Sequence, residues 1–280
     1  MTQNKIPQPR ISTYPIEIFG TLYNDQSPLA QDYRNRQHCP YLNRECTKPR
    51  KSEPHIKVGI CSVGYSGFLP TAVPNIICPH RFLDPNLFRS IQRFFYPEWQ
   101  SFTLSSEVSM GVGGNVDYVL SNPNNYNDFL CVEIQANGTT GSPYNYVREI
   151  LTTGVYSGSS YTFGLNWANE FSKTMMQQAY KKGKIATYWG KKIVFIIQDV
   201  AMQYLIANMD TSALRENRED SIHFLMYKMV WNPNEGRFFL QIDSWKSTCT
   251  DGISRMLGGA DTTQYPDISD FINTIRRRTI

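Results

Sequence analysis

Two acidic residues and an amide stand where they could hold a metal ion. Asp117 precedes Glu133 by sixteen residues, and Gln135 follows in the segment CVEIQ. Because side chains alternate along a strand, Glu133 and Gln135 share one face of an apolar run that normally excludes such groups. Two carboxylates, with waters and phosphate oxygens, suit Mg²⁺. The spacing therefore predicts metal-assisted phosphodiester hydrolysis, with Mg²⁺ held by Asp117 and Glu133.

Two further residues are candidates for supporting roles in this chemistry. Gln135 cannot titrate, so we expect its amide to orient the attacking water or a phosphate oxygen. Glu107, ten residues before Asp117, is an additional acid that would bind the metal directly or through water. The spacing fits a structural interpretation equally well, in which Asp117 ends a strand, Glu133 pairs with an arginine and Gln135 is a satisfied polar residue.

Four cysteines form a second candidate site. They are Cys39, Cys46, Cys61 and Cys78, whereas Cys131 and Cys249 stand alone. In a reducing compartment such a cluster indicates a metal site, because four thiolates complete a tetrahedral shell. His38 and His80 flank the cluster as alternative ligands. The spacing C-x6-C-x14-C-x16-C is not that of a standard zinc finger, so buried thiols without a metal remain the alternative.

The hydrophobic pattern predicts the elements that must position the acids. Residues 116–120 and 129–134 are typical of two strands, joined across a polar turn at 122–128. Such a hairpin would bring Asp117 close to Glu133. We expect one face of the second strand to pack in the core and the face that carries Glu133 to look into a cleft.

The other predicted elements complete a mixed sheet with helices. Asp84 and Pro85 predict a helix start. A second helix from 168 is expected to stop at Gly183, with Lys181 and Lys182 as cations at its C-terminus. Further predictions are a strand buried on both faces at 193–197, a helix at 200–209, a hairpin of 222–230 with 237–243, and a C-terminal helix capped by Asp267.

Bulk composition limits the classes of protein. The 280 residues, 41% of them hydrophobic, suffice for one large α/β domain with or without a small satellite. We find no run of about 20 apolar residues that would predict a membrane span, and MTQNKIPQPR lacks the apolar core of a signal peptide. We therefore expect a cytoplasmic protein. The net charge of +4 permits a nucleic-acid partner without requiring one.

Three regions differ in character. Residues 1–35 are expected to form an N-terminal arm, residues 36–83 a four-cysteine metal-binding subdomain, and residues 84–280 the catalytic core. The apolar runs of the middle region are too short to build a core, so a metal ion is expected to stabilise it.

The segments HCPYLNREC, GICSVGY, IICPHRF, NVDYVL and CVEIQ, in this order, closely resemble the NotI-type restriction endonucleases over roughly residues 39–199. The resemblance implies an α/β (α+β) fold of the PD-(D/E)xK nuclease type, with a mixed central sheet flanked by helices. It also implies a prokaryotic type II enzyme that acts as a homodimer, uses Mg²⁺ to cut a palindromic site in double-stranded DNA, and works beside a cognate DNA methyltransferase. By position, the catalytic set would be Asp117, Glu133 and Gln135, and a structural iron, with zinc as the alternative, would be held by Cys39, Cys46, Cys61 and Cys78.

Two departures from the wider superfamily concern the catalytic motif. Val116 replaces a proline, and Gln135 replaces a lysine, a change that the NotI-type branch shares. A missing cation leaves more of the transition-state charge to the metal. The basic residues expected to contact the DNA backbone include Lys48, Arg50 and Lys51 of the cysteine segment, and Arg89, Arg93, Lys173, Lys181, Lys182 and Lys184.

Two rival interpretations stay open on sequence alone. One is a repair nuclease with a four-cysteine iron-sulfur cluster, although there the cysteines typically lie on both sides of the nuclease motif. The other is a DNA-binding module without catalysis, in which Asp117 and Glu133 are only structural.

Overall fold

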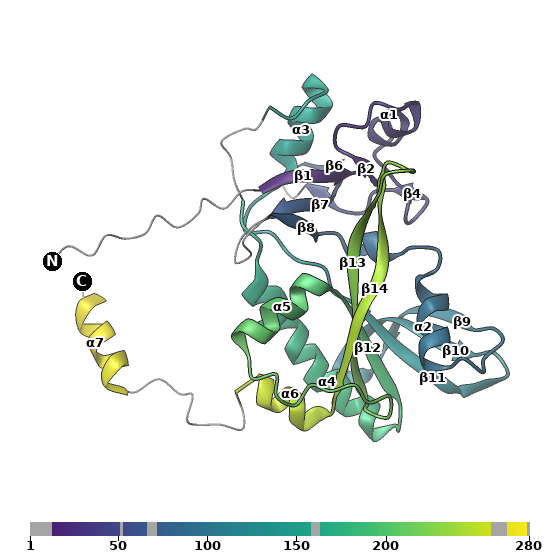
Figure 1. Cartoon of the computed structure of the whole chain (residues 1–280), viewed down its shortest axis with the longest axis vertical. Coiled ribbons are helices and arrows are strands. Elements are labelled where there is room, and N and C mark those ends of the chain that lie inside the picture. Colours follow the sequence, from purple (N-terminus) through teal and green to yellow (C-terminus); the bar gives the residue numbers. More distant parts are fainter. Residues whose placement is uncertain (1–12, 51–52, 66–71, 158–162, 259–267, 279–280) are drawn as a thin grey trace.

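The computed structural model describes residues 13–50, 53–65, 72–157, 163–258 and 268–278. Within these ranges two β-sheets, each with helices beside it, form the body of the protein, and the smaller sheet lies above the larger one in Figure 1. The mixed α/β fold class predicted from the sequence is thereby confirmed.

The larger sheet has six strands and carries the candidate catalytic acids. Its order is β14-β13-β12-β11-β10-β9, with β11, β12 and β13 mutually parallel and the outer pairs antiparallel. The strands are β9 (Thr103–Ser109), β10 (Asn115–Asn122), β11 (Asn125–Ile134), β12 (Lys192–Gln198), β13 (Ile222–Asn232) and β14 (Arg237–Thr248).

Both faces of this sheet are covered. On one face α4 (Met176–Tyr188), α5 (Asp199–Asn208) and α6 (Thr250–Met256) pack on a core that includes Phe195 and Phe224. On the other face, α2 (Leu87–Phe95) and the short helix η1 (Pro79–Phe82) cover Val194 and Leu225 (Figure 1). Burial on both sides explains why β12 is an uninterrupted apolar run.

The smaller sheet has the order β2-β1-β7-β8. Its strands are β1 (Thr13–Ile18), β2 (Thr21–Leu22), β7 (Ile60–Tyr65) and β8 (Val73–Ile76), and nearby lie the two-stranded ribbons of β3 (His38–Cys39) with β4 (Arg44–Glu45) and of β5 (Pro49–Arg50) with β6 (Glu53–Lys57). Because β1 pairs with β7, the described part of the expected arm shares a sheet with Cys61. The three domain boundaries stay a prediction.

Helices α1 (Pro28–Asn35) and α3 (Tyr144–Thr153) flank the smaller sheet at the top of Figure 1. The short helix η2 (Gly111–Gly113) links β9 to β10, and the π-helix η3 (Ala168–Met175) leads into α4. The C-terminal helix α7 (Ile268–Arg278) lies apart from the sheets in Figure 1. The predicted C-terminal helix is therefore present, whereas its predicted cap, Asp267, lies outside the described residues.

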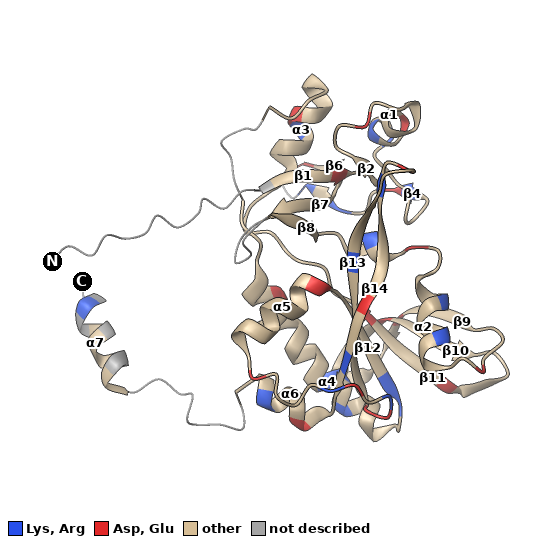
Figure 2. Cartoon of the chain, in the orientation of Figure 1, with Lys and Arg blue, Asp and Glu red and all other residues tan. Residues whose placement is uncertain are grey.

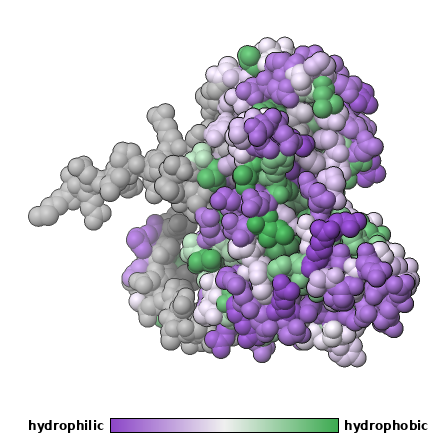
Figure 3. All heavy atoms as spheres, turned by 45° about the vertical axis from the view of Figure 1, so that its right-hand side comes forward, coloured by the Kyte–Doolittle hydropathy of each residue, from purple (hydrophilic) through white to green (hydrophobic). Residues whose placement is uncertain are grey.

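Buried polar contacts join the two sheets. Arg81 of η1 pairs through Nε with Glu17 Oε2 of β1 at 2.8 Å, and its guanidinium donates to the carbonyl of Phe238 in β14 at 2.8 Å. Gln198, at the end of β12, accepts the Ile76 N–H at 2.8 Å and donates to the Pro74 carbonyl at 2.6 Å. Figure 3 shows hydrophobic atoms gathered on the surface between the more hydrophilic upper and lower parts. The sheets are therefore fixed to one another.

Two predicted helix ends are wrong. Helix α2 begins at Leu87 behind Asn86, and Asp84 instead accepts the Asn86 N–H at 2.9 Å in the preceding turn. Helix α4 continues past Gly183 to Tyr188. A glycine ends a helix when it adopts a positive φ, but Gly183 is helical and serves close packing, because a Cβ there would collide with Ile222 of β13.

The remaining predicted elements are confirmed. Strands β10 and β11 form the expected hairpin, but β11 already begins at Asn125, so most of the turn predicted at 122–128 is strand. Strands β13 and β14 form the second hairpin, with longer strands than predicted. Strand β12 and helix α5 occupy the predicted segments within two residues. In the described part of the chain, no helix combines the length and the apolar character that a membrane crossing needs.

Replacing Arg81 by leucine tests the joint between the sheets. The change leaves Glu17, which is 3% exposed, without its counter-charge, so we expect the free energy of unfolding in urea to fall by about 3–5 kcal/mol. The control is Lys57→Met, which removes a pair with the exposed Glu45 and should cost no more than about 1 kcal/mol. Equal small losses in both variants would show that Arg81 does not hold the sheets together.

Candidate active site

Three carboxylates lie in a row across three adjacent strands. Tyr118 pairs with Val132 of β11 and with Ser106 of β9. One step along the same registers sets Asp117 opposite Glu133 on one side and opposite Glu107 on the other. The structure therefore brings Asp117 and Glu133 together as predicted, and it places Glu107 beside them.

The row stands where β10 and β11 separate. Their last paired residues are Tyr118 and Val132. Beyond them the Ile134 N–H donates to Asp117 Oδ2 at 2.8 Å, and the backbone N–H of Asp117 lies near the Glu133 carboxylate and favours its charged form. Asp117 thus takes a backbone donor that the strand ladder would otherwise use. The two side chains are fixed by the backbone at this fork.

Glu107 has an unusual backbone. Its φ of 53° lies in the left-handed region although β9 continues on both sides of it. For a residue with a Cβ this conformation costs on the order of 1–3 kcal/mol and is concentrated at functional sites. This strain supports the selection of Glu107, whose side chain is exposed.

A lysine that the sequence analysis misinterpreted completes the cluster. Lys182 of α4 places Nζ 2.6 Å from Glu133 Oε1 and 2.6 Å from the Asn115 carbonyl oxygen. It is 4% exposed, so it is neither a helix-end cation nor one of the solvent-exposed lysines of α4. The sequence does contain a signal for the burial of Lys182, because it continues a helical spacing of buried residues. These are Met175, Ala179, Lys182 and Ala186, which lie along one side of the helix.

Burial and mutual repulsion shift the two central acids. Desolvation, and then the charge of Asp117, raise the pKa of Glu133 to about 7, against the opposing effect of Lys182. Burial also raises the pKa of Asp117, which the Ile134 N–H and Lys182 oppose. Both acids are therefore poorly compensated as anions and would gain from a further cation.

The prediction of an open cleft above Glu133 is wrong. Glu133 is 4% exposed and lies under α4, because helices cover both faces of the sheet. Gln135 follows the end of β11, and its amide donates to the Ala136 carbonyl and to Glu170 Oε2, both at 3.2 Å. Glu170 of η3 is a neighbouring acid that the sequence analysis missed, since no periodicity connects η3 with β11.

The four cysteines line one small cavity of about 10 Å³. Cys39, Cys46, Cys61 and Cys78 share its wall with His38, His80 and Lys48. Burial is the main cause that raises the pKa values of the Cys39, Cys61 and Cys78 thiols. The nearby backbone N–H groups of Tyr41 and Leu42 act in the opposite direction on the Cys39 pKa. The predicted cysteine cluster therefore exists in space.

The donor chemistry of this cavity suits iron or zinc, since both metals accept four thiolates. Among the residues that the structure describes, however, no group of three or more His, Cys, Asp or Glu side chains is arranged to hold a metal ion. The sulfur atoms would have to draw together to bind one. The same finding applies to the carboxylate row.

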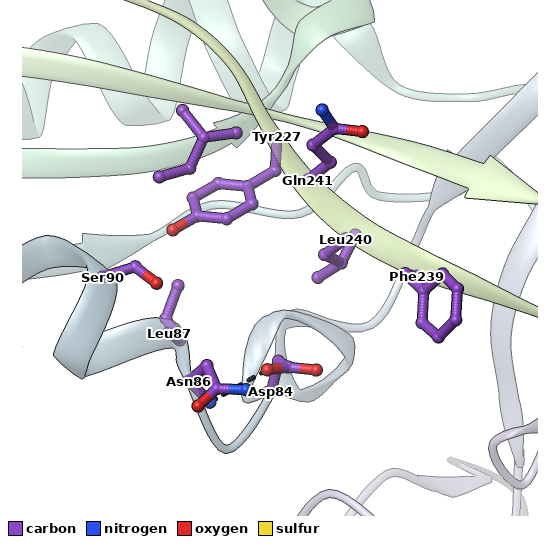
Figure 4. A pocket seen from close by; sticks show the side chains of 9 residues that line it. Asp84, Asn86, Leu87, Ser90, Tyr227, Phe239, Leu240 and Gln241 are labelled. Carbon is purple, nitrogen blue, oxygen red and sulfur yellow. Dashed lines mark hydrogen bonds between the residues drawn. The ribbon is translucent and has the colours of Figure 1, made fainter.

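A larger cavity of about 430 Å³ lies on the opposite face of the sheet. Figure 4 shows Asp84 and Asn86, in the turn before α2, and Ser90 of α2 across from Tyr227 of β13, while the Gln241 amide of β14 points away from them. Of its lining residues only Asp84 is acidic, and the core that surrounds Tyr227 is the one under α2. Although this cavity is larger than the cysteine cavity, it lacks the paired carboxylates that the predicted chemistry needs.

The cations expected to meet DNA differ in their surroundings. Lys48 donates to the Ile77 carbonyl at 3.1 Å, and Arg50 pairs with Glu53, whereas Lys51 lies outside the described residues. Arg89 and Arg93 are exposed on α2, where Figure 2 shows basic positions at the outer side of the large sheet. The α2 pair is therefore better placed for a polyanion than Lys48.

The raised pKa of Glu133 predicts how stability depends on pH in metal-free protein. Between the ordinary glutamate value and about 7, the folded state keeps a proton that the unfolded chain has released. This stabilising contribution is full below about pH 4.5 and is lost as the pH rises through 7, by up to about 3 kcal/mol. In EDTA, urea unfolding of the wild type should show this loss relative to Glu133→Gln. Curves that run parallel from pH 4.5 to 7.5 would contradict it, and Glu216→Gln, an exposed acid, is the control.

Comparison with known proteins identifies the family. A search of curated proteins finds no match to the chain. The family model of restriction endonuclease NotI matches residues 23–240, which include the four cysteines, the carboxylate row and strands β9 to β13 of the large sheet. Since this is more than half of the chain, the protein belongs to the NotI restriction endonuclease family and is a site-specific deoxyribonuclease that acts on double-stranded DNA.

Proposed function

We propose that the protein is a type II restriction endonuclease that hydrolyses the DNA backbone with Mg²⁺ held by Asp117 and Glu133. The observation that supports this most is the row of Glu107, Asp117 and Glu133 at the point where β10 and β11 separate. Carboxylates held side by side and poorly compensated are the ligands that a hydrated divalent cation prefers.

The residues of the chain would divide the work as follows. Asp117 and Glu133 would bind the metal, and Glu107 would do so directly or through a water. Bound Mg²⁺ supplies positive charge to the phosphate and lowers the pKa of the attacking water. The Gln135 amide is held by Glu170, so its carbonyl oxygen can accept a hydrogen bond from the water and orient it. The family match speaks against both the repair nuclease and the non-catalytic binding module.

The number of active sites bears on assembly. One chain has one carboxylate row, and a cut through both strands requires two attacks. We therefore propose a homodimer whose two-fold axis coincides with that of a palindromic site. In the cell, a cognate DNA methyltransferase would protect the same site.

The cysteine cavity would hold a structural metal. We propose iron, with zinc as the alternative, bound by Cys39, Cys46, Cys61 and Cys78. These residues come from β3, the segment after β4, β7 and the start of η1, so a single ion would tie four separate segments together. Its contribution would be to folding rather than to the reaction.

Cleavage of phage DNA tests the proposed reaction. With Mg²⁺, the purified protein should release discrete fragments, and Glu133→Ala should reduce the rate by about 100-fold or more while leaving DNA binding intact. The exposed Glu216→Ala is the control and should cut normally. A smear of fragments would indicate a nonspecific nuclease, and uncut DNA would contradict the proposal.

Elemental analysis tests the structural metal. The wild-type protein should carry about one iron or zinc per chain, and Cys61→Ser should lose the metal and unfold at a lower temperature. Cys249→Ser changes an exposed cysteine outside the cavity and should retain the metal. A metal-free wild type purified without chelators would contradict the proposal.

A further inference from the structure

The packing around α4 accommodates the buried side chain of Lys182. The neighbouring lysines Lys181 and Lys184 are exposed, whereas Lys182 points inward and is 4% exposed. Gly183 lets α4 approach Ile222, and a Cβ on Gly113 would lie 2.7 Å from Ile185 and 3.6 Å from the Lys182 stem. Close packing at these two glycines thus lets the Lys182 side chain reach from α4 to Glu133 of the large sheet.

The ammonium group is only partly used. A lysine carries three N–H donors. One is donated to Glu133 Oε1 and one to the Asn115 carbonyl, each at 2.6 Å. Among the described residues these are the two hydrogen-bond partners of Nζ. A third donor therefore remains for a ligand that arrives at the carboxylates.

A bound metal would remove the charge that repels an anionic ligand. Glu107, Asp117 and Glu133 lie near the ammonium of Lys182, and a divalent cation would bring the formal charge of these groups from negative to neutral. An oxygen of a phosphate could then enter beside Nζ. A fixed cation in a site with little water is worth far more to a developing negative charge than one in solution.

We propose that Lys182 is a further catalytic residue, which donates its third N–H to a non-bridging oxygen of the scissile phosphate. This inference rests on the proposed function. The water oxygen forms a bond to phosphorus while the bond to the leaving sugar oxygen breaks, the proton of the water passes to solvent, and the leaving oxygen takes a proton from solvent. Lys182 takes no part in these proton transfers, and its ammonium group stabilises the negative charge on the phosphoryl oxygen. It supplies from α4 the cation that the E-x-Q segment of β11 lacks.

Substitution of Lys182 by methionine separates this role from a structural one. Methionine keeps the length of the stem and removes the charge. At saturating Mg²⁺ we expect the single-turnover cleavage rate to fall by about 100-fold, while calorimetric titration with MgCl₂ shows binding at least as tight as in the wild type, because a competing cation is gone. A lysine that only supports the fold would weaken Mg²⁺ binding together with the rate.

The matched control is Lys246→Met. Lys246 also pairs with a glutamate, Glu216, at 2.7 Å, but on the surface, and its loss should change neither the rate nor Mg²⁺ binding. A Lys182→Met variant that cuts within threefold of the wild type, or whose slower rate is matched by weaker Mg²⁺ binding, would overturn the inference. If the wild type itself does not cut, the proposed function fails instead.

A second measurement needs no folded variant. In a crystal structure of the wild type with Ca²⁺ and a duplex defined by the fragment ends, Lys182 Nζ should lie within about 3.2 Å of an oxygen of the scissile phosphate. A separation beyond about 5 Å, with the duplex in place, would overturn the inference even if Lys182→Met and Lys182→Gln fail to fold.

Discussion

The repulsion between Asp117 and Glu133 is the constraint around which the large sheet is organised. Opposite positions on neighbouring strands hold the two carboxylates side by side in a setting with little water, where both lose hydration and neither gains full compensation. Backbone N–H groups and Lys182 partly offset the repulsion and the loss of hydration. The site therefore stores unfavourable electrostatic energy that a divalent cation would relieve, which is how active sites exchange stability for function.

The smaller sheet is coupled to this constraint through a short stretch of chain. Cys78 lines the thiol cavity, His80 lines it as well and acts electrostatically on Asp117, and Arg81 pairs with Glu17. All three belong to η1 or to the residue before it. The cysteine cluster and the candidate site are therefore separated by only a few residues along this stretch of chain.

Local sequence patterns predicted where the strands lie, but they did not predict what surrounds the strands. Alternation in 116–120 and 129–134 established the hairpin, and the pairing of Asp117 with Glu133 followed from it. Alternation says which residues share a face, but it does not say what covers that face, so the expected cleft was in fact filled by α4. The predicted helix end at Gly183 was wrong for the same reason. Glycine is common at helix ends, but at this position it is required by the close contact with Ile222, which is distant in the sequence. Lys182 was misinterpreted as a consequence, because a helix that ends at 183 leaves its last lysines in solvent.

The cysteine cavity shows why spacing alone could not decide between a metal site and buried thiols. Cys39 and Cys78 are each followed by a proline, which has no N–H, and the backbone N–H groups that favour their thiolates are those of Tyr41 and Leu42 for Cys39 and of His80 for Cys78. Such donors favour the thiolate, whereas burial favours the thiol and is the larger effect without a metal. A metal ion would reverse that balance, since thiolate ligands are deprotonated on binding. The backbone N–H groups beside Cys39 and Cys78 therefore already favour the thiolate form that a metal would need.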